Sequence, residues 1–441
     1  MVATLASPVD TLDPTSVRCL ILPISLCTLT AALCALPQKG HSDTTQHMIP
    51  ILLDKSTLQM LSSEEASRLT DYYHVVYCPT LFSEIMADLK KETDKAKAVA
   101  EVRKTATKIS GYQSYFTTGF RTLVFAELLG NKIEMMTKPL VSGGVFHDDP
   151  QGGLGYFLDE QPEFEALRRW TEGNFTKAEE LMAENWRSAT KALNYEQWKK
   201  DIKKTVTLRT IEDLIGFVDL MINDQSVQEL FLHMLFSDLS YNPSDQSEMI
   251  GKWISAGRPD LKTHCPYTHH CIRIFQTFYF GLSQNLIGTR PTNRVDIEYL
   301  LYLPFCRVFS SEDNLLKLLS PYFLRGNDFI GGKELKVDLA SLAGILASMS
   351  TEDKALYRKE FGKYPPGGTD SFTTALWLRY FGVKSKAFAP IERNTADDGR
   401  EKAKLKELQE LAKRGEQAME KEIWKYGKRG PDYSPPPRPP N

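Results

Sequence analysis

Four acidic residues stand at positions from which their carboxylates could meet. Asp54 and Asp313 each follow a short apolar segment, and Glu84 and Asp296 lie in segments with helical spacing. Carboxylates brought close together repel one another unless a cation lies between them. Hard divalent ions such as Mg²⁺ or Mn²⁺ prefer oxygen ligands of this kind. A site of this type would activate water and stabilise the in-line displacement that cleaves a phosphodiester bond.

The first two acids lie in an alternation of strands and helices. Residues 51–53 and 74–78 are short apolar segments typical of buried strands, and residues 55–70 have helical spacing. Pro79 ends the second strand, and Thr80 is placed to cap the helix that carries Glu84. This rhythm predicts a parallel sheet with crossover helices.

The other two acids lie in residues 293–322. Asp296 is expected at the head of a helix, residues 305–309 are expected to form a buried strand, and Asp313 follows that strand. In a parallel sheet the carboxyl ends of the strands and the starts of the following helices share one edge, where ligands bind. The four carboxylates are therefore expected to converge although they are far apart in the sequence.

This layout resembles the PIN-domain nucleases. The resemblance rests on Asp54 after the first strand, Glu84 in the second helix, and Asp296 and Asp313 on either side of a late strand. Residues 309–313 are similar to that family's strand and following Ser/Thr-x-Asp turn. The resemblance covers about residues 48–90 and 285–325, with a further strand near Leu335.

The resemblance implies that Asp54, Glu84 and Asp296 hold the metal ion and that Asp313 completes or orients the site. Ser56 and Ser311 would be hydrogen-bond partners of these ligands. In this family the activity would be metal-dependent endoribonuclease cleavage of RNA, in a toxin–antitoxin or phage-defence setting. Neighbouring acids could replace three of the four: Asp88 for Glu84, Glu298 for Asp296 and Glu312 for Asp313.

Three arginines near the late acids could bind phosphate oxygens of a substrate: Arg290, Arg294 and Arg307. The expected fold class is α/β, a PIN-like parallel sheet over residues 48–342 with a large, mostly helical insertion over about residues 90–270. The insertion includes a glycine-rich loop at residues 142–156. A helical C-terminal region is expected over residues 343–428, followed by a proline-rich tail at residues 429–441.

Composition sets few limits on function. The chain has 441 residues, 42% hydrophobic and 25% charged, with a net charge of −2, so RNA would have to be bound by local basic groups. Seven cysteines, an odd number, do not form an evident disulfide framework and favour a reducing, cytoplasmic compartment.

Residues 1–47 differ from the rest of the chain. Residues 19–37 contain no charged side chain and could form a signal segment, which would make the protein exported or membrane-anchored. Pro23 interrupts this stretch, and Met48 stands directly before the first predicted strand. We therefore favour Met48 as the natural start and no association with a membrane.

A non-enzymatic function is the main alternative. The chain would then be a catalytically inactive PIN-like scaffold that binds RNA or a partner protein. Residues 393–426 form a highly charged predicted helix with one apolar seam, which suits docking to a partner protein or pairing in a homo-oligomer. Acids gathered within reach of one metal ion would favour the enzyme, and acids paired with Arg or Lys would favour the scaffold.

Overall fold

The structure, a computed structural model, describes residues 48–381 except 110, 112, 136, 138–139, 142–144, 149–153, 158–160, 197–198, 200–205 and 367–369. Residues 1–47, the charged helix predicted over 393–426 and the proline-rich tail therefore lie outside the described residues. Within the described part, none of the helices is long and apolar enough to cross a membrane.

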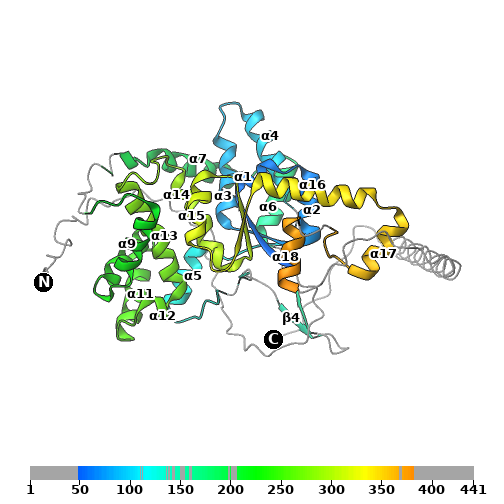
Figure 1. Ribbon diagram of the computed structural model, residues 1–441. Coiled ribbons are helices and arrows are strands. Elements are labelled where there is room, and N and C mark those ends of the chain that lie inside the picture. The colour runs from blue at the N-terminus through cyan, green and yellow to red at the C-terminus, as the bar shows by residue number, and fades with distance from the viewer. Residues whose placement is uncertain are drawn as a thin grey trace, which may run out of the picture. The chain divides into compact units, whose positions relative to one another are not determined.

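An all-parallel sheet of five described strands forms the centre of the fold, so the protein belongs to the α/β class (Figure 1). The strands lie in the order β3-β2-β1-β6-β7. Their bounds are β1 (Ile49–Leu53), β2 (Tyr73–Tyr77), β3 (Ser114–Phe116), β6 (Val308–Ser311) and β7 (Asp328–Gly331).

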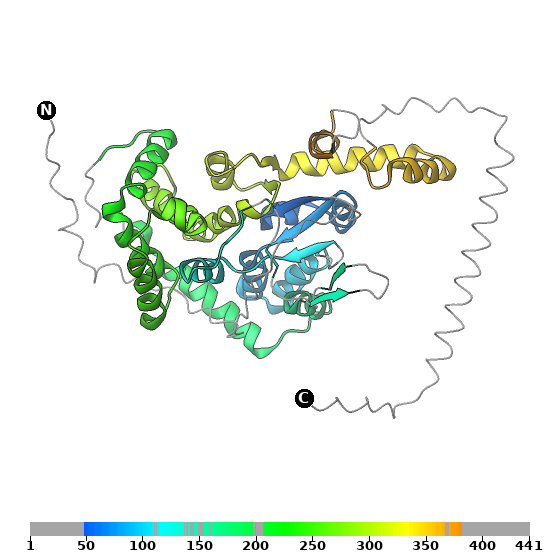
Figure 2. The same ribbon diagram turned by 90° about the horizontal axis from the view of Figure 1, so that it is seen from below.

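The two central strands are buried along their whole length because both faces of the sheet are covered. All five residues of β1 are buried, as are all four of β6. Ile51 lies opposite Val75 of β2 on one side and Val308 of β6 on the other. Helix α16 (Gly332–Ser348) lies on one side of the sheet and α3 (Pro79–Ala87) on the other (Figure 2).

The direction of chain progression across the sheet reverses next to β1. From β1 the chain moves outward through β2 and β3, and it later returns to place β6 on the other side of β1, followed by β7. In open parallel sheets, the carboxyl ends of the two strands at such a reversal form a crevice in which ligands bind. Here these ends are Leu53 and Ser311.

The early helices confirm the predicted alternation and correct its details. The helix expected over residues 55–70 is divided into α1 (Lys55–Met60) and α2 (Ser63–Tyr72). The division occurs because Ser62 forms a capping box with Glu65 and so starts a new helix. Helix α3 begins at Pro79 with Cys78 in the cap position, so Thr80 is not the cap.

The segment expected to be a helical insertion also contributes to the central sheet. Strand β3 lies within it and pairs in parallel with β2, which was not predicted because three residues are too short to show a strand pattern. The glycine-rich stretch expected as a loop forms the antiparallel pair β4 (Val145–Asp148) and β5 (Leu154–Phe157). The other described elements of this segment are helical: η2 (Asp88–Lys90), α4 (Lys95–Ala106), α5 (Phe120–Leu128), α6 (Pro162–Thr171), α7 (Lys177–Ala192), α9 (Ile211–Ile222), η3 (Gln225–Val227), α10 (Gln228–Asp238), α11 (Pro243–Ser255), α12 (Leu261–His264) and α13 (Pro266–Ser283).

The late segment places its acids somewhat differently from the expectation. Asp296 ends the short helix α14 (Asn293–Asp296) instead of starting a helix, and η4 (Ile297–Phe305) continues as a 3₁₀ helix. The strand expected over residues 305–309 therefore starts only at Val308. The remaining elements are α15 (Asn314–Leu319), η5 (Ser320–Tyr322), α17 (Thr351–Phe361) and α18 (Phe372–Phe381).

Helix α16 crosses the predicted domain boundary after residue 342 and packs against α1, α2 and β7. It approaches α1 closely at its first residue, Gly332. A methyl group there would lie 3.0 Å from Oγ1 and 3.2 Å from Cα of Thr57, which is fully buried. Thr57 Oγ1 is in turn 3.2 Å from the hydroxyl oxygen of Ser310 in β6. Gly332 therefore keeps α16 against the edge of the sheet at which β1 and β6 end.

We expect Gly332→Ala to lower the free energy of unfolding by about 1–3 kcal/mol, because the added methyl group overpacks this contact. Gly344→Ala in the same helix is the matched control, since a methyl group there meets nothing within 4 Å. It should be neutral or stabilise the protein by up to about 1 kcal/mol through helix propensity. Urea unfolding measures both changes, and equal stabilities of the two variants would contradict this account of the α16 contact.

Candidate active site

Asp54 is the most buried of the predicted acids, with 3% of its surface exposed. It directly follows β1 and caps α1, where its Oδ1 accepts a hydrogen bond from the backbone N–H of Thr57 at 2.8 Å. Its Oδ2 accepts hydrogen bonds from the hydroxyls of Ser56 and Ser311, both at 2.6 Å. Burial raises the pKa of Asp54 above its usual 3.8, and these hydrogen bonds offset part of that increase.

The two serines that sequence analysis assigned as partners of the ligands both reach Asp54, and they also connect it to the turn after β6. The Ser56 hydroxyl accepts a hydrogen bond from the backbone N–H of Glu312 at 2.8 Å, and the Ser311 hydroxyl accepts one from the N–H of Asp313 at 3.0 Å. The ends of β1 and β6 are thus held together by side chains as well as by the sheet.

Glu84 lies on α3, beside the end of β1. Its Oε2 accepts a hydrogen bond of 2.5 Å from the hydroxyl of Tyr299 in η4. Burial raises the pKa of Glu84 to about 7, and the negative charges of Asp54 and Asp88 add to this increase. The positive charge of Lys55 and the Tyr299 hydrogen bond act in the opposite direction.

Asp296 and Asp313 complete the group. The Asp296 side chain is 13% exposed, and burial together with the charges of Glu84 and Asp313 raises its pKa to about 7. Asp313 caps α15, where its Oδ1 accepts hydrogen bonds from the N–H groups of Leu315 and Leu316. The structure therefore brings all four predicted acids to one edge of the sheet, where their charges influence one another.

The neighbouring acids proposed as substitutes are engaged elsewhere. Asp88 forms ion pairs with Lys55 at 2.6 Å and with Arg187 of α7 at 2.9 Å. Glu312 pairs with Lys317 at 2.6 Å. Glu298 pairs with a buried arginine at 2.8 Å. Each of these three carboxylates thus has a cation of its own.

Of the three predicted arginines, Arg290 is the one found at the acids. Its Nη2 lies 2.6 Å from Oδ2 of Asp296 and 3.1 Å from Oδ2 of Asp313, and its side chain is 57% exposed. It therefore balances two of the four carboxylates while remaining accessible to a ligand in solution.

The structure does not bring the other two arginines to the acids. Arg294 is the buried partner of Glu298, and its guanidinium lies 4.3 Å from the centre of the Phe275 ring. Arg307 precedes β6 and therefore lies at the opposite, amino-terminal edge of the sheet, with its guanidinium 4.8 Å from the centre of the Tyr380 ring. Closeness in sequence to Asp296 and Asp313 therefore does not determine whether an arginine reaches the acids.

Two residues of this site were not predicted. Lys55 is held 2.9 Å from the backbone carbonyl oxygen of Glu84 and stabilises the ionised form of that acid. Its position directly after Asp54 was a usable signal, because the residue after a strand's last acid lies at the same edge. Tyr299 stands within an apolar run, and nothing in the sequence distinguishes it from a core residue.

The chemistry of the donors suits a hard divalent cation, because all four side chains offer carboxylate oxygens. Arg290 pairs with two of them, and the neighbouring Lys55 pairs with a fifth acid, Asp88. Within the described part of the chain, however, no three Asp, Glu, His or Cys side chains are arranged so that they could hold a metal ion. For these acids to surround an ion, their side chains would have to move. Asp296 or Asp313 would first have to be released from Arg290.

Comparison of the chain with protein-family models, with curated proteins and with solved structures finds no match in any of the three. The geometry of the acids therefore has to support a functional assignment by itself.

The raised pKa of Asp296 predicts how stability depends on pH. An aspartate that is protonated up to about pH 7 when folded, but only up to about pH 4 when unfolded, makes the protein less stable as pH rises between these values. In metal-free buffer at pH 8, Asp296→Asn should therefore raise the free energy of unfolding, by on the order of 2 kcal/mol. At pH 5 the advantage should shrink.

Urea unfolding at the two pH values measures this effect. Asp328→Asn is the control, because Asp328 lies at the opposite edge of the sheet and pairs with Arg379 at 2.6 Å. It should not stabilise the protein at either pH. An Asp296→Asn variant that is less stable than the unmodified protein at pH 8 would show that the pair with Arg290 outweighs the repulsion between the acids.

Proposed function

We propose that this protein is a PIN-like, metal-dependent endoribonuclease that cleaves RNA with a bound Mg²⁺ or Mn²⁺ ion. The observation that carries the proposal is the gathering of Asp54, Glu84, Asp296 and Asp313 at one edge of the sheet. Burial, with the charges of neighbouring carboxylates added to it, raises the pKa of Glu84 and of Asp296 to about 7 there. They stand at the carboxyl edge of a parallel sheet beside the reversal of strand order, where α/β proteins bind ligands.

Asp54, Glu84 and Asp296 would hold the ion, with Asp313 completing or orienting the site. When bound, the ion would supply an activated water and charge stabilisation for in-line cleavage of a phosphodiester bond. Ser56 and Ser311 hold the Asp54 carboxylate in one orientation by donating to its Oδ2. Lys55 favours the ionised form of Glu84, which is the form able to act as a ligand.

Arg290 would have two partners in turn. With the acids free, it neutralises Asp296 and Asp313. When a metal cation neutralises these acids instead, the exposed guanidinium of Arg290 would bind a phosphate oxygen of the RNA beside them. A toxin–antitoxin or phage-defence setting remains part of this proposal by resemblance to the family. From the sequence we also propose a cytoplasmic location and, through residues 393–426, binding of a partner protein or a second copy.

One observation favours a second function. Arg290 pairs with two of the four acids, and no described set of three acids is arranged around a metal position. A PIN-like scaffold that binds RNA or a partner protein without cleaving it would keep such pairs permanently. The two functions differ in whether the acids bind a divalent cation.

The decisive experiment is cleavage of a mixed RNA pool by purified protein, with Mn²⁺ or Mg²⁺ and with EDTA. Asp54→Asn and Asp296→Asn should each lower the metal-dependent rate at least about 100-fold, since even residues that only support metal ligands are worth 10–100-fold. Asp328→Asn, which changes an aspartate at the opposite edge of the same sheet, should cleave like the unmodified protein.

Calorimetric titration with Mn²⁺ separates the outcomes. Metal binding without cleavage would keep the carboxylate site and point to a missing substrate or activator. A folded protein that neither binds Mn²⁺ nor cleaves any RNA of the pool would contradict the nuclease and favour the scaffold.

Arg290→Gln should have two opposite effects. Mn²⁺ should bind more tightly, because the competing cation is removed from Asp296 and Asp313. RNA should bind about 10-fold more weakly or worse, because a charge-assisted hydrogen bond to phosphate is lost. Calorimetry measures the first effect, and the KM for RNA at saturating Mn²⁺ measures the second.

The matched control for Arg290→Gln is Arg307→Gln at the amino-terminal edge of the sheet, which should leave both quantities unchanged. If the two variants behave alike, the interpretation of Arg290 is wrong.

A further inference from the structure

The 3₁₀ helix η4 contacts α3 through the polar side chains of two consecutive residues, Glu298 and Tyr299. Glu298 Oε2 accepts a hydrogen bond from the hydroxyl of Thr80 at 2.9 Å, and the Tyr299 hydroxyl donates to Oε2 of Glu84 at 2.5 Å. Thr80 and Glu84 are one helical turn apart on α3. The segment that carries Asp296 is therefore joined to the helix that carries Glu84 at two successive positions.

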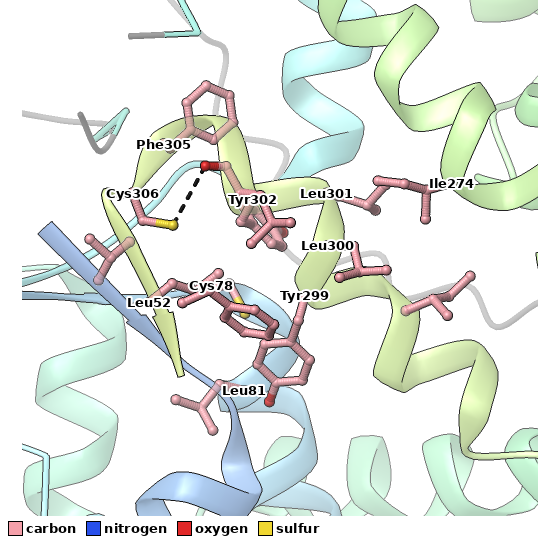
Figure 3. Packing of buried hydrophobic residues seen from close by; sticks show 14 of the residues in the cluster. Leu52, Cys78, Leu81, Ile274, Tyr299, Leu300, Leu301, Tyr302, Phe305 and Cys306 are labelled. Atoms are coloured by element: carbon pink, nitrogen blue, oxygen red, sulfur yellow. Dashed lines mark hydrogen bonds between the residues drawn. The ribbon is translucent and has the colours of Figure 1, made fainter. Parts of the chain in front are cut away.

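Tyr299 is anchored in the hydrophobic core. It is 1% exposed and belongs to a run in which every residue from Tyr299 to Phe305 is buried. Its ring points from η4 in the direction of Leu81 on α3, and its hydroxyl is at the far end (Figure 3). Close packing leaves an aromatic ring of this kind little freedom, so the position of the hydroxyl is set by the core.

Glu84 needs such a support because its side chain is long. A glutamate with three rotatable bonds loses considerable conformational entropy when its carboxylate must occupy one position. The Lys55 ammonium is hydrogen-bonded to the backbone carbonyl oxygen of Glu84 at 2.9 Å and ion-paired with Asp88 at 2.6 Å. The hydrogen bond from Tyr299 holds Oε2 in place and so restricts the orientations that the carboxylate can adopt.

We propose that Tyr299 is a positioning residue that holds the Glu84 carboxylate in the orientation in which it binds the divalent cation. This inference rests on the proposed function and deepens it. A phenylalanine would fill the same space in the core, so the hydroxyl is the part of Tyr299 that serves the site. It acts from within the core, without touching the ion or the RNA.

The test compares Tyr299→Phe with Tyr302→Phe. Tyr302 is one turn further along η4 and equally buried. Its hydroxyl accepts a hydrogen bond of 3.3 Å from the backbone N–H of Phe120 and interacts with the Thr80 hydroxyl, not with Glu84. Each substitution removes one buried hydroxyl group with its hydrogen bonds and leaves the aromatic ring in place. Circular dichroism and urea unfolding establish that both variants are folded.

Tyr299→Phe should weaken Mn²⁺ binding in calorimetric titration about 10–100-fold, the range found for residues that orient metal ligands. It should lower kcat for RNA cleavage to a similar extent and leave the KM for RNA unchanged at saturating Mn²⁺. Tyr302→Phe should match the unmodified protein in all three quantities. In a Glu84→Gln background, Tyr299→Phe should add less than about two-fold to the loss, because its effect passes through Glu84.

Three results would overturn the inference. The first is equal Mn²⁺ affinity of Tyr299→Phe and the unmodified protein, and the second is an equal loss in the two phenylalanine variants, which would indicate core packing. The third is that Tyr299→Phe weakens Mn²⁺ binding as strongly in the Glu84→Gln background as in the unmodified protein. A failure of the proposed function looks different, since the unmodified protein itself would then bind no Mn²⁺, and the inference would fall with it.

Discussion

The buried carboxylate of Asp54 is the interaction on which this edge of the molecule depends. Burying an ionised carboxylate is very costly unless its oxygens accept hydrogen bonds. Here one backbone N–H and two hydroxyls meet that need, and the hydroxyls come from both sides of the junction between β1 and β6. Asp54 thereby starts α1, joins β1 to the turn after β6, and fixes the place around which Glu84, Asp296 and Asp313 gather.

The burial and mutual repulsion of the acids at this edge of the sheet lower the stability of the folded protein. Glu84 and Asp296 are held where their pKa values rise to about 7, although a solvent-exposed position would avoid this cost. Lys55 lowers the pKa of Glu84 from a mostly buried position, and Arg290 pairs with Asp296 from an accessible one. Natural proteins concentrate unfavourable electrostatics of this kind at functional sites, where activity is gained at the expense of stability.

The sequence predicted the parts of this arrangement that follow from general rules of parallel sheets. Strands β1 and β2 were recognisable because both faces are covered and their residues are almost all apolar, and the gathering of the four acids was expected from the shared edge of strand ends. The contacts of Ser56 and Ser311 with Asp54 were expected from the family resemblance. Strand β3 was missed because it is short, and the start of β6 was misplaced because the apolar residues before it wind as a 3₁₀ helix. The positions of Arg294 and Arg307 depend on packing and on strand direction, which spacing does not reveal, and Tyr299 is hidden in an apolar run.

The pairing of β1 with β6 has a consequence for how the site comes into being. The hydrogen bond between Ser311 and Asp54 joins residues 257 positions apart, so the site is among the least local contacts of the chain. Contacts of such high sequence separation form slowly, because a long loop must close before they contribute to stability. During synthesis, Asp54 and Glu84 emerge from the ribosome long before Asp296 and Asp313 exist. The four acids can therefore assemble only after the chain has been made beyond Asp313, and a shorter nascent chain carries Asp54 and Glu84 without their later partners.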